Sequence, residues 1–246
     1  TRPKFMYRLP TFQNPTGVTM SLERRRKVVE LAAAHNVPIL EDDPYGALRF
    51  EGQPLPTLVE LDAARHAENA RTGSYAQGNV VYLSSFSKTL APGLRLAWAV
   101  CPPEVARQFV MAKQGSDLHS NALAQTMAYE FLRRGWLPDQ VQRIRETYLT
   151  RRNAMCEAIA AYFPSSVRYT RPQGGLFLWV ILPEGFDTVA LLSEAVARKV
   201  AFVPGKPFFV DGSGANTMRL SFASVPPELI REGIKRLGEL IAAKLR

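Results

Sequence analysis

The sequence has little cysteine and little histidine, and it has no long hydrophobic run. Its 246 residues include only two cysteines and three histidines. Cys101 and Cys156 form neither a C-x-x-C pair nor a disulfide ladder, which predicts reduced thiols and a cytoplasmic protein. The histidines, at positions 35, 66 and 119, lack metal-ligand spacing, so no metal site is predicted. No apolar run approaches the roughly 20 residues of a membrane span, and no membrane association is expected.

The start of the chain has neither an initiator methionine nor the apolar core of a signal peptide. Residues 4–9 read K-F-M-Y-R-L, which is the pattern of a strand already in progress. We therefore expect that an N-terminal region is missing from this chain. A processed mature start is the alternative, and no sequence signal supports it.

Acidic residues are in deficit, with 22 of them against 31 basic residues and a net charge of +9. Such a balance is found in nucleic-acid-binding proteins. Here, however, the basic residues are scattered or stand in short helical runs, at 24–27 and 133–134, and no helix-turn-helix, zinc finger or aromatic RNA-binding motif accompanies them. Solvated helix faces explain these runs, and a nucleic-acid partner is not expected.

The first part of the chain alternates short apolar segments with an amphipathic one. Strand-like segments lie at 6–9, 38–40, 80–83 and 94–100, and the spacing of apolar residues after Ser21 predicts a helix over 22–36. Residues 52–78 are polar and are predicted to be loop with some helix. Short buried strands separated by helices favour an α/β layer with a mostly parallel sheet.

The chain becomes helical from Pro103. Apolar residues recur at three- and four-residue steps from Leu137 to Tyr162, which predicts one long helix of the kind that joins two domains. After Pro164, strands are predicted at 167–169, 176–181, 201–203 and 218–222, with helices at 188–198 and 228–245. The sequence thus predicts two domains: a larger one over 1–150 and a compact α+β domain over 151–246.

The most informative motif is Ser84 to Leu96, which reads S-S-F-S-K-T-L-A-P-G-L-R-L. It places Lys88 just past the end of a buried strand. Ser85, Ser87 and Arg95 can donate hydrogen bonds to one phosphate, while Lys88 can form an imine with an aldehyde. Taken alone, the motif is also consistent with a surface lysine in a serine-rich loop.

Three further residues extend this site. Asp42 ends another strand, where its carboxylate can pair with a pyridinium nitrogen and keep it protonated, and Tyr45 can donate to a phenolate oxygen of the same ring. Asn14, in the N-P-T-G turn, can donate to that oxygen as well. A solvated acidic turn and a plain chain reversal are the alternative interpretations of these two segments.

Arg219 stands within the apolar strand segment M-R-L-S-F. A buried guanidinium needs an anionic partner. That partner is either a substrate carboxylate, gripped by the planar fork, or an acidic residue of the protein itself.

In this order, N-P-T-G, D-x-x-Y, S-x-S-K-x6-R, P-x-G-G-x-F-x-W and R-L-S-F resemble the motifs of the fold-type I pyridoxal-phosphate (PLP) aminotransferases. The resemblance covers essentially the whole chain and is closest to the branch of 2-aminoadipate and kynurenine aminotransferases. It implies the aspartate aminotransferase-like α/β fold, here with an incomplete large domain, a mostly parallel sheet and a small α+β C-terminal domain. It also implies a homodimer that takes an amino acid and a 2-oxo acid.

The resemblance assigns a role to each of these residues. Lys88 is the Schiff-base lysine and proton shuttle, and the pyridine ring of PLP is held by Asp42, Tyr45 and Asn14. The phosphate is bound by Ser85, Ser87 and Arg95, and the substrate is bound by Asn14 and Arg219. Two alternatives stay open. One is an aminotransferase-like, PLP-sensing domain of a transcription regulator, although such domains usually lack the asparagine before P-T-G. The other is an inactive truncated fragment.

Overall fold

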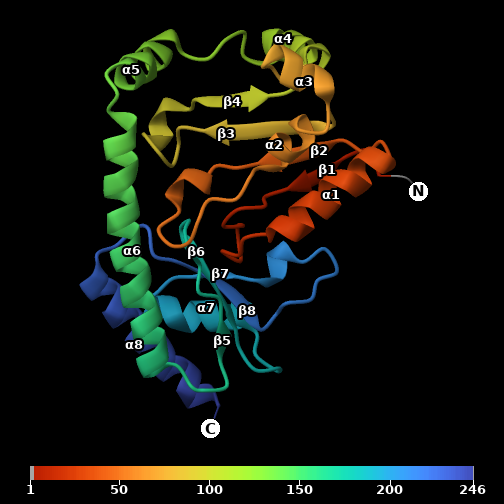
Figure 1. The fold of residues 1–246 in the computed structure, drawn as a ribbon. Coiled ribbons are helices and arrows are strands. Elements are labelled where there is room, and N and C mark those ends of the chain that lie inside the picture. The colour runs from red at the N-terminus through yellow and green to blue at the C-terminus, as the bar shows by residue number, and fades with distance from the viewer. Residues whose placement is uncertain (1–2, 246) are drawn as a thin grey trace. The chain divides into compact units, whose positions relative to one another are not determined.

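The computed structural model describes residues 3–245, apart from the side chain of Glu68 (Figure 1). The chain divides into two compact units. The first unit contains Thr1–Thr11, Thr19–Leu48 and Gly52–Ile144, and the second contains Phe12–Val18, Arg49–Glu51 and Arg145–Arg246. Two short early segments therefore belong to the same unit as the C-terminal part of the chain.

The first unit is built on a four-stranded sheet with the order β1-β2-β3-β4 (Figure 1). The strands are β1 (Met6–Arg8), β2 (Ile39–Asp42), β3 (Val80–Ser85) and β4 (Ala97–Val100). β1, β2 and β3 run parallel, and β4 is antiparallel to β3. The predicted α/β layer with a mostly parallel sheet is confirmed. The helices of this unit are α1 (Leu22–Ala34), α2 (Leu58–Ala63), α3 (Ala67–Thr72), α4 (Pro103–Ser116) and α5 (Ala122–Arg133).

One face of this sheet carries the core of the first unit. Ile39 of β2 and Val80 of β3 lie opposite each other in the parallel register and pack with Val29 of α1 and Leu58 of α2. Since side chains alternate along a strand, residues 40 and 42 of β2 point to the other face. The helices α1 and α2 thus cover one face, and the end of β2 presents Asp42 on the opposite one.

The buried guanidinium of Arg25 ties α1 to the segment that follows β1. It donates to the carbonyl of Pro10 at 3.0 Å, to Thr11 Oγ1 at 2.8 Å and to the carbonyl of Pro56 at 2.9 Å. The interpretation of the basic run 24–27 as a solvated face is therefore wrong for Arg25, because this side chain is fully buried. The loop between β1 and α1 is held from inside the unit.

Glu41 is fully buried on the helix-covered face of β2. Its carboxylate accepts the backbone N–H groups of Leu58 at 2.8 Å and Val59 at 2.9 Å, in the first turn of α2. Burial raises the pKa of Glu41 from 4.5 to about 7, against the opposing effect of these two hydrogen bonds. The folded chain therefore binds a proton at Glu41 more tightly than the unfolded chain does.

We expect the free energy of unfolding to fall as the pH rises from about 4.5 to about 7, because the folded state is the one that holds the proton in this window. The contribution of Glu41 is roughly 3 kcal/mol. In Glu41→Gln this part of the pH dependence should disappear, as measured by urea unfolding at pH 5, 6, 7 and 8. Glu239→Gln, at an exposed position of α8, controls for the loss of one negative charge. Parallel losses of stability in the wild type and Glu41→Gln would contradict this assignment.

The second unit has its own antiparallel sheet with the order β5-β6-β8-β7. Its strands are β5 (Arg168–Tyr169), β6 (Phe177–Ile181), β7 (Val203–Pro204) and β8 (Thr217–Ser221), and its helices are α7 (Thr188–Ala197), α8 (Pro227–Lys244) and most of α6 (Leu137–Tyr162). The predicted long helix is confirmed in α6. A single apolar core joins the sheet to all three helices, with Ile159 of α6, Leu191 of α7 and Ile241 of α8 fully or almost fully buried.

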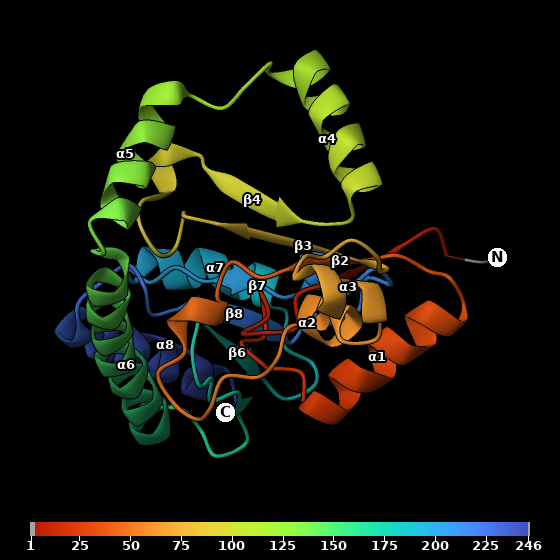
Figure 2. The ribbon, with the colours of Figure 1, turned by 45° about the horizontal axis from the view of Figure 1, so that its top comes forward.

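The outer part of the first unit is poorly buried. Figure 2 shows α4 and α5 beyond β4, on the side away from β3. All four residues of β4 are exposed, and α4 has no buried residue. Large apolar side chains are exposed on both helices, among them Phe109, Val110, Met111, Leu123 and Met127. Among residues 3–245 no helix is both long enough and apolar enough to cross a membrane.

Candidate active site

The open face of the first unit's sheet gathers polar side chains at the ends of two neighbouring strands. Asp42 is the last residue of β2 and is paired in register with Leu83 of β3, so Ser85 lies two residues further along the same face. Both side chains are half-buried. The carboxyl ends of parallel strands are where open α/β sheets bind ligands. This edge of the sheet is therefore the candidate site in the first unit.

Lys88 lies in the connection between β3 and β4. The chain turns directly after Ser85, because the N–H of Leu90 donates to the carbonyl of Phe86 at 2.8 Å and the N–H of Ser87 donates to Ser85 Oγ at 3.3 Å. The Lys88 side chain is half-buried, and within the described part of its unit no hydrogen bond or ion pair holds its Nζ. An amine in this position is available for a ligand.

The same connection carries the predicted phosphate ligands. Ser85 and Ser87 are half-buried, and Arg95 is exposed near its far end. Arg95 has a φ of 53°, in the left-handed region that a side chain with a Cβ rarely adopts. Strained conformations of this kind cluster at binding sites. One of its guanidinium nitrogens donates to the carbonyl of Pro92 at 3.3 Å, and the remaining donors of the fork can serve an anion.

Asp42 has a partner that the sequence did not reveal. Tyr7 of β1 donates its phenol hydrogen to Asp42 Oδ2 at 2.5 Å. Tyr45 is almost fully buried just after β2, and it is close enough to Tyr7 to help raise the pKa of the Tyr7 phenol. Asp42 Oδ1 has no hydrogen-bond partner among the described residues of this unit. One oxygen of the carboxylate is thus fixed, and the other can accept from a ligand.

The second unit brings Asn14 and Arg219 together across 205 residues of sequence. Arg219, on β8, donates from Nη1 to Asn14 Oδ1 at 2.7 Å. The turn around Asn14 can approach the sheet because Gly17 has a φ of +70° and because a Cβ there would lie 2.5 Å from the carbonyl oxygen of Phe177. No residue in the described part of the second unit accepts a hydrogen bond from Asn14 Nδ2, so its two N–H groups can donate to a ligand.

Two aromatic rings frame the Arg219 guanidinium. Its Cζ lies 4.2 Å from the ring centroid of Phe177 and 5.8 Å from that of Phe208. Aromatic faces attract the guanidinium and fix its plane. Neither ring was predicted as a site residue, although both belong to segments rich in glycine, proline and aromatic residues. A planar guanidinium that is held in this way can bind a carboxylate with two parallel hydrogen bonds.

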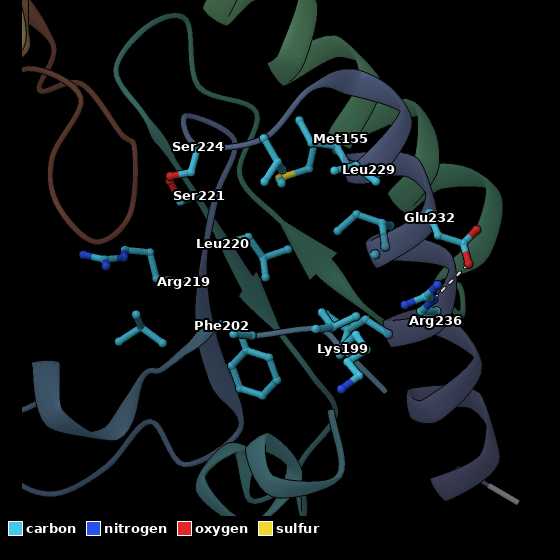
Figure 3. A pocket seen from close by; sticks show the side chains of 18 residues that line it. Met155, Lys199, Phe202, Arg219, Leu220, Ser221, Ser224, Leu229, Glu232 and Arg236 are labelled. Carbon is cyan, nitrogen blue, oxygen red and sulfur yellow. Dashed lines mark hydrogen bonds and ion pairs between the residues drawn. The ribbon is translucent and has the colours of Figure 1, made fainter. Parts of the chain in front are cut away.

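A cavity of about 610 Å³ lies beside β8 in the second unit. Figure 3 shows Leu220 and Phe202 directed toward it, whereas the guanidinium of Arg219 extends away from it. This arrangement follows from the alternation of side chains along β8. The cavity is lined mainly by apolar residues of β8, α8 and the segment before β7. Arg219 is itself one of the residues that line the cavity, so the cavity borders the Asn14–Arg219 pair.

The predicted residues thus form two groups. Lys88, Asp42, Tyr45, Ser85, Ser87 and Arg95 lie in the first unit, and Asn14 and Arg219 lie in the second. Within each group the fold places residues from distant parts of the sequence at one sheet edge or in direct contact.

Comparisons with known proteins give a consistent result. A family model described as aminotransferase class I and II matches residues 6–237. Aromatic-amino-acid aminotransferase 1 of Thermococcus litoralis is 43% identical over 99% of this chain and 55% of that protein. The solved alpha-aminoadipate aminotransferase of Thermus thermophilus, complexed with N-(5'-phosphopyridoxyl)-L-leucine, matches with a TM-score of 0.89 at 42% identity, over 99% of this chain and 60% of that one.

A relative of a different kind is matched less closely. The uncharacterized HTH-type transcriptional regulator YisV of Bacillus subtilis is 31% identical over 96% of this chain and 46% of that protein. The chain therefore spans about half to three-fifths of the length of these relatives.

Proposed function

The chain belongs to the class I and II aminotransferases, and on this basis we propose that it transfers an amino group between an amino acid and a 2-oxo acid, with PLP bound at Lys88. The observation that carries the proposal is the open edge of the first unit's sheet. There, a half-buried lysine follows one strand and a half-buried carboxylate ends the next. A lysine that forms an imine and a carboxylate that pairs with the ring nitrogen are groups that proteins use to bind and activate PLP.

The chemistry of the residues fits PLP. The hydroxyls of Ser85 and Ser87 and the guanidinium of Arg95 suit a phosphate dianion, and the available Nζ of Lys88 suits an aldehyde. Asp42 Oδ1 suits the hydrogen of a protonated ring nitrogen. Tyr45 and the N–H groups of Asn14 are proposed as donors to the phenolate oxygen.

When bound, PLP supplies an aldehyde that captures the amine and a ring that withdraws electrons from the substrate's α-carbon. We assign the other steps to side chains of this chain. Lys88 Nζ, set free when the substrate amine takes its place, would remove the proton from the α-carbon and deliver it to the cofactor carbon that carried the aldehyde, which is general acid–base catalysis. Asp42 holds the proton on the ring nitrogen. Arg219 binds the α-carboxylate of the substrate and so orients the α-proton.

We further propose that the protein acts in the cytoplasm as a homodimer. The isolated cysteines support the compartment. The exposed apolar side chains of α4 and α5 support the dimer, because contiguous apolar patches on soluble proteins usually mark contact surfaces. The relatives' names make aromatic amino acids and 2-aminoadipate the first amino donors to assay.

The regulator alternative has weaker support. The chain is 31% identical to the HTH-type regulator and 43% identical to the aromatic aminotransferase. Asn14, which regulator domains usually lack, is present and bonded to Arg219. The higher identity to the aminotransferase and the presence of Asn14 both favour an enzyme over a regulator.

The test is borohydride reduction of the 246-residue chain after incubation with PLP, followed by peptide mapping. Reduction turns the bond between PLP and a lysine into a stable secondary amine. We expect the label on Lys88 and on no other lysine in stoichiometric amount. Absence of a label, or a label spread over many lysines, would overturn the proposal for this chain and favour the inactive-fragment alternative.

A further inference from the structure

A hydrogen bond links Tyr7 of β1 to Asp42 of β2, the carboxylate that we propose as the partner of the ring nitrogen. The phenol oxygen of Tyr7 lies 2.5 Å from Asp42 Oδ2. This distance is at the short end of the range for a hydroxyl that donates to a carboxylate. Tyr7 belongs to none of the motifs that identify the site.

The register of the sheet explains how Tyr7 reaches Asp42. Tyr7 is paired with Leu40 in the parallel β1–β2 ladder, so the side chains of both residues point to the same face. Asp42 lies two residues beyond Leu40 on that face, a diagonal step within the length of a tyrosine side chain. The bond therefore connects an edge strand to the open face, where Ser85 also lies.

The hydrogen bond has a fixed direction. Partial burial and the adjoining Asp42 carboxylate raise the pKa of Tyr7 well above its ordinary value, so the phenol stays protonated and donates throughout the neutral range. A donor of this kind stabilises the ionised form of the carboxylate that accepts it. It also restricts rotation of the carboxylate, which leaves Oδ1 as the oxygen presented to a ligand.

We propose that Tyr7 is a positioning residue: its hydrogen bond fixes the orientation of the Asp42 carboxylate, so that Asp42 keeps the proton on the ring nitrogen of the cofactor. The inference rests on the proposed function, since it concerns PLP bound at Lys88. Tyr7 acts through Asp42 and contacts no reacting atom. Without its bond, Asp42 loses the donor that fixes its orientation, and Oδ1 no longer holds the ring proton in place.

This role has a spectroscopic signature. A protonated ring nitrogen withdraws electrons and makes the nitrogen that links Lys88 to the cofactor less basic. Loss of the Tyr7 hydroxyl should therefore raise the pH at which the bound cofactor changes its absorbance by about one unit. The free energy of a hydrogen bond to a charged group is comparable with that of a one-unit pKa shift. We also expect kcat to fall about tenfold, with little change in the KM of the amino acid.

The experiment compares PLP-loaded wild type, Tyr7→Phe and Tyr162→Phe by absorbance over pH 5 to 10 and by borohydride labelling. Tyr162 is an exposed tyrosine at the end of α6 and serves as the matched control. A shift confined to Tyr7→Phe, with Lys88 labelled in all three proteins, supports the proposal. Labelled Lys88 without any shift would overturn the role of Tyr7 and leave the proposed function intact. Unlabelled Lys88 in the wild type would overturn the proposed function itself.

A double variant separates positioning from a structural effect. If Tyr7 acts only through Asp42, then Tyr7→Phe should change neither the absorbance titration nor kcat when it is added to Asp42→Asn. An additional loss of similar size in the Asp42→Asn background would show that Tyr7 acts on the fold and would refute the proposal.

Discussion

Replacing Lys88 with alanine is expected to lower transamination by about 10⁴-fold or more. Proton transfer by a positioned side chain contributes up to about 10⁴-fold, and covalent capture of the cofactor depends on the same Nζ. The loss should appear in kcat, because Arg219, which we assign to the substrate carboxylate, is unchanged. Steady-state rates with an aromatic amino acid or 2-aminoadipate as donor measure it.

The matched control is Lys235→Ala, at an exposed position of α8. It should keep the wild-type rate and the wild-type borohydride label. Lys88→Ala should lose the label and keep its free energy of unfolding within about 0.5 kcal/mol of the wild type, since no hydrogen bond or ion pair holds its Nζ within the described part of its unit. Unchanged turnover in Lys88→Ala would remove this lysine from the mechanism.

The spacing of apolar residues predicted most of the helices and strands, because the residues that face a core must be apolar at every second position of a strand and at every third or fourth position of a helix. The long helix over 137–162 and the three parallel strands are confirmed. The first and last residues of a strand were less predictable where hydrogen bonding to a neighbouring strand determines them. β7 was expected at 201–203 and is found at Val203–Pro204, because only these two residues pair with β8. Nothing in the residue types at 201 and 202 indicates where the pairing between β7 and β8 begins.

Residues 52–78 show a signal that could have been used. They were predicted to be loop with some helix, and they contain α2 and α3. Thr57 and Glu60 form a capping box, in which each side chain accepts from the backbone of the other residue. The pattern T-x-x-E is a known start of a helix. The division of the chain into domains at residue 150 stays a prediction.

The site was predictable only where its motifs are local. Lys88, Ser85 and Ser87 are neighbours in sequence, so their proximity needs no fold. Tyr7 became visible only through the β1–β2 register, because an exposed tyrosine in a short strand has no distinguishing pattern. The bond between Asn14 and Arg219 likewise depends on a turn and a strand that meet only in the folded second unit. Contacts between distant segments are fixed by topology, which no single motif encodes.

Replacing Arg219 with methionine is expected to lower kcat/KM for the amino acid by about 10²- to 10³-fold, or about 3–4 kcal/mol. The guanidinium is held by Asn14 on one side and by the ring of Phe177 on another, so its fork is oriented before the substrate arrives. Arg219→Lys should recover only part of the activity, because an ammonium keeps the charge but cannot make two parallel bonds to a carboxylate.

The substrate itself offers the sharpest control. An amine that lacks the α-carboxylate has nothing for Arg219 to bind, so its slow reaction should be equal in wild type and Arg219→Met. The ratio of kcat/KM for the amino acid to that for the matching amine should therefore collapse in the variant. Arg236→Met, which removes a half-buried arginine of α8 paired with Glu232, should leave that ratio unchanged. An equal loss for both substrates would instead mean that Arg219 supports the fold around Asn14, because only a carboxylate-binding role distinguishes the two molecules.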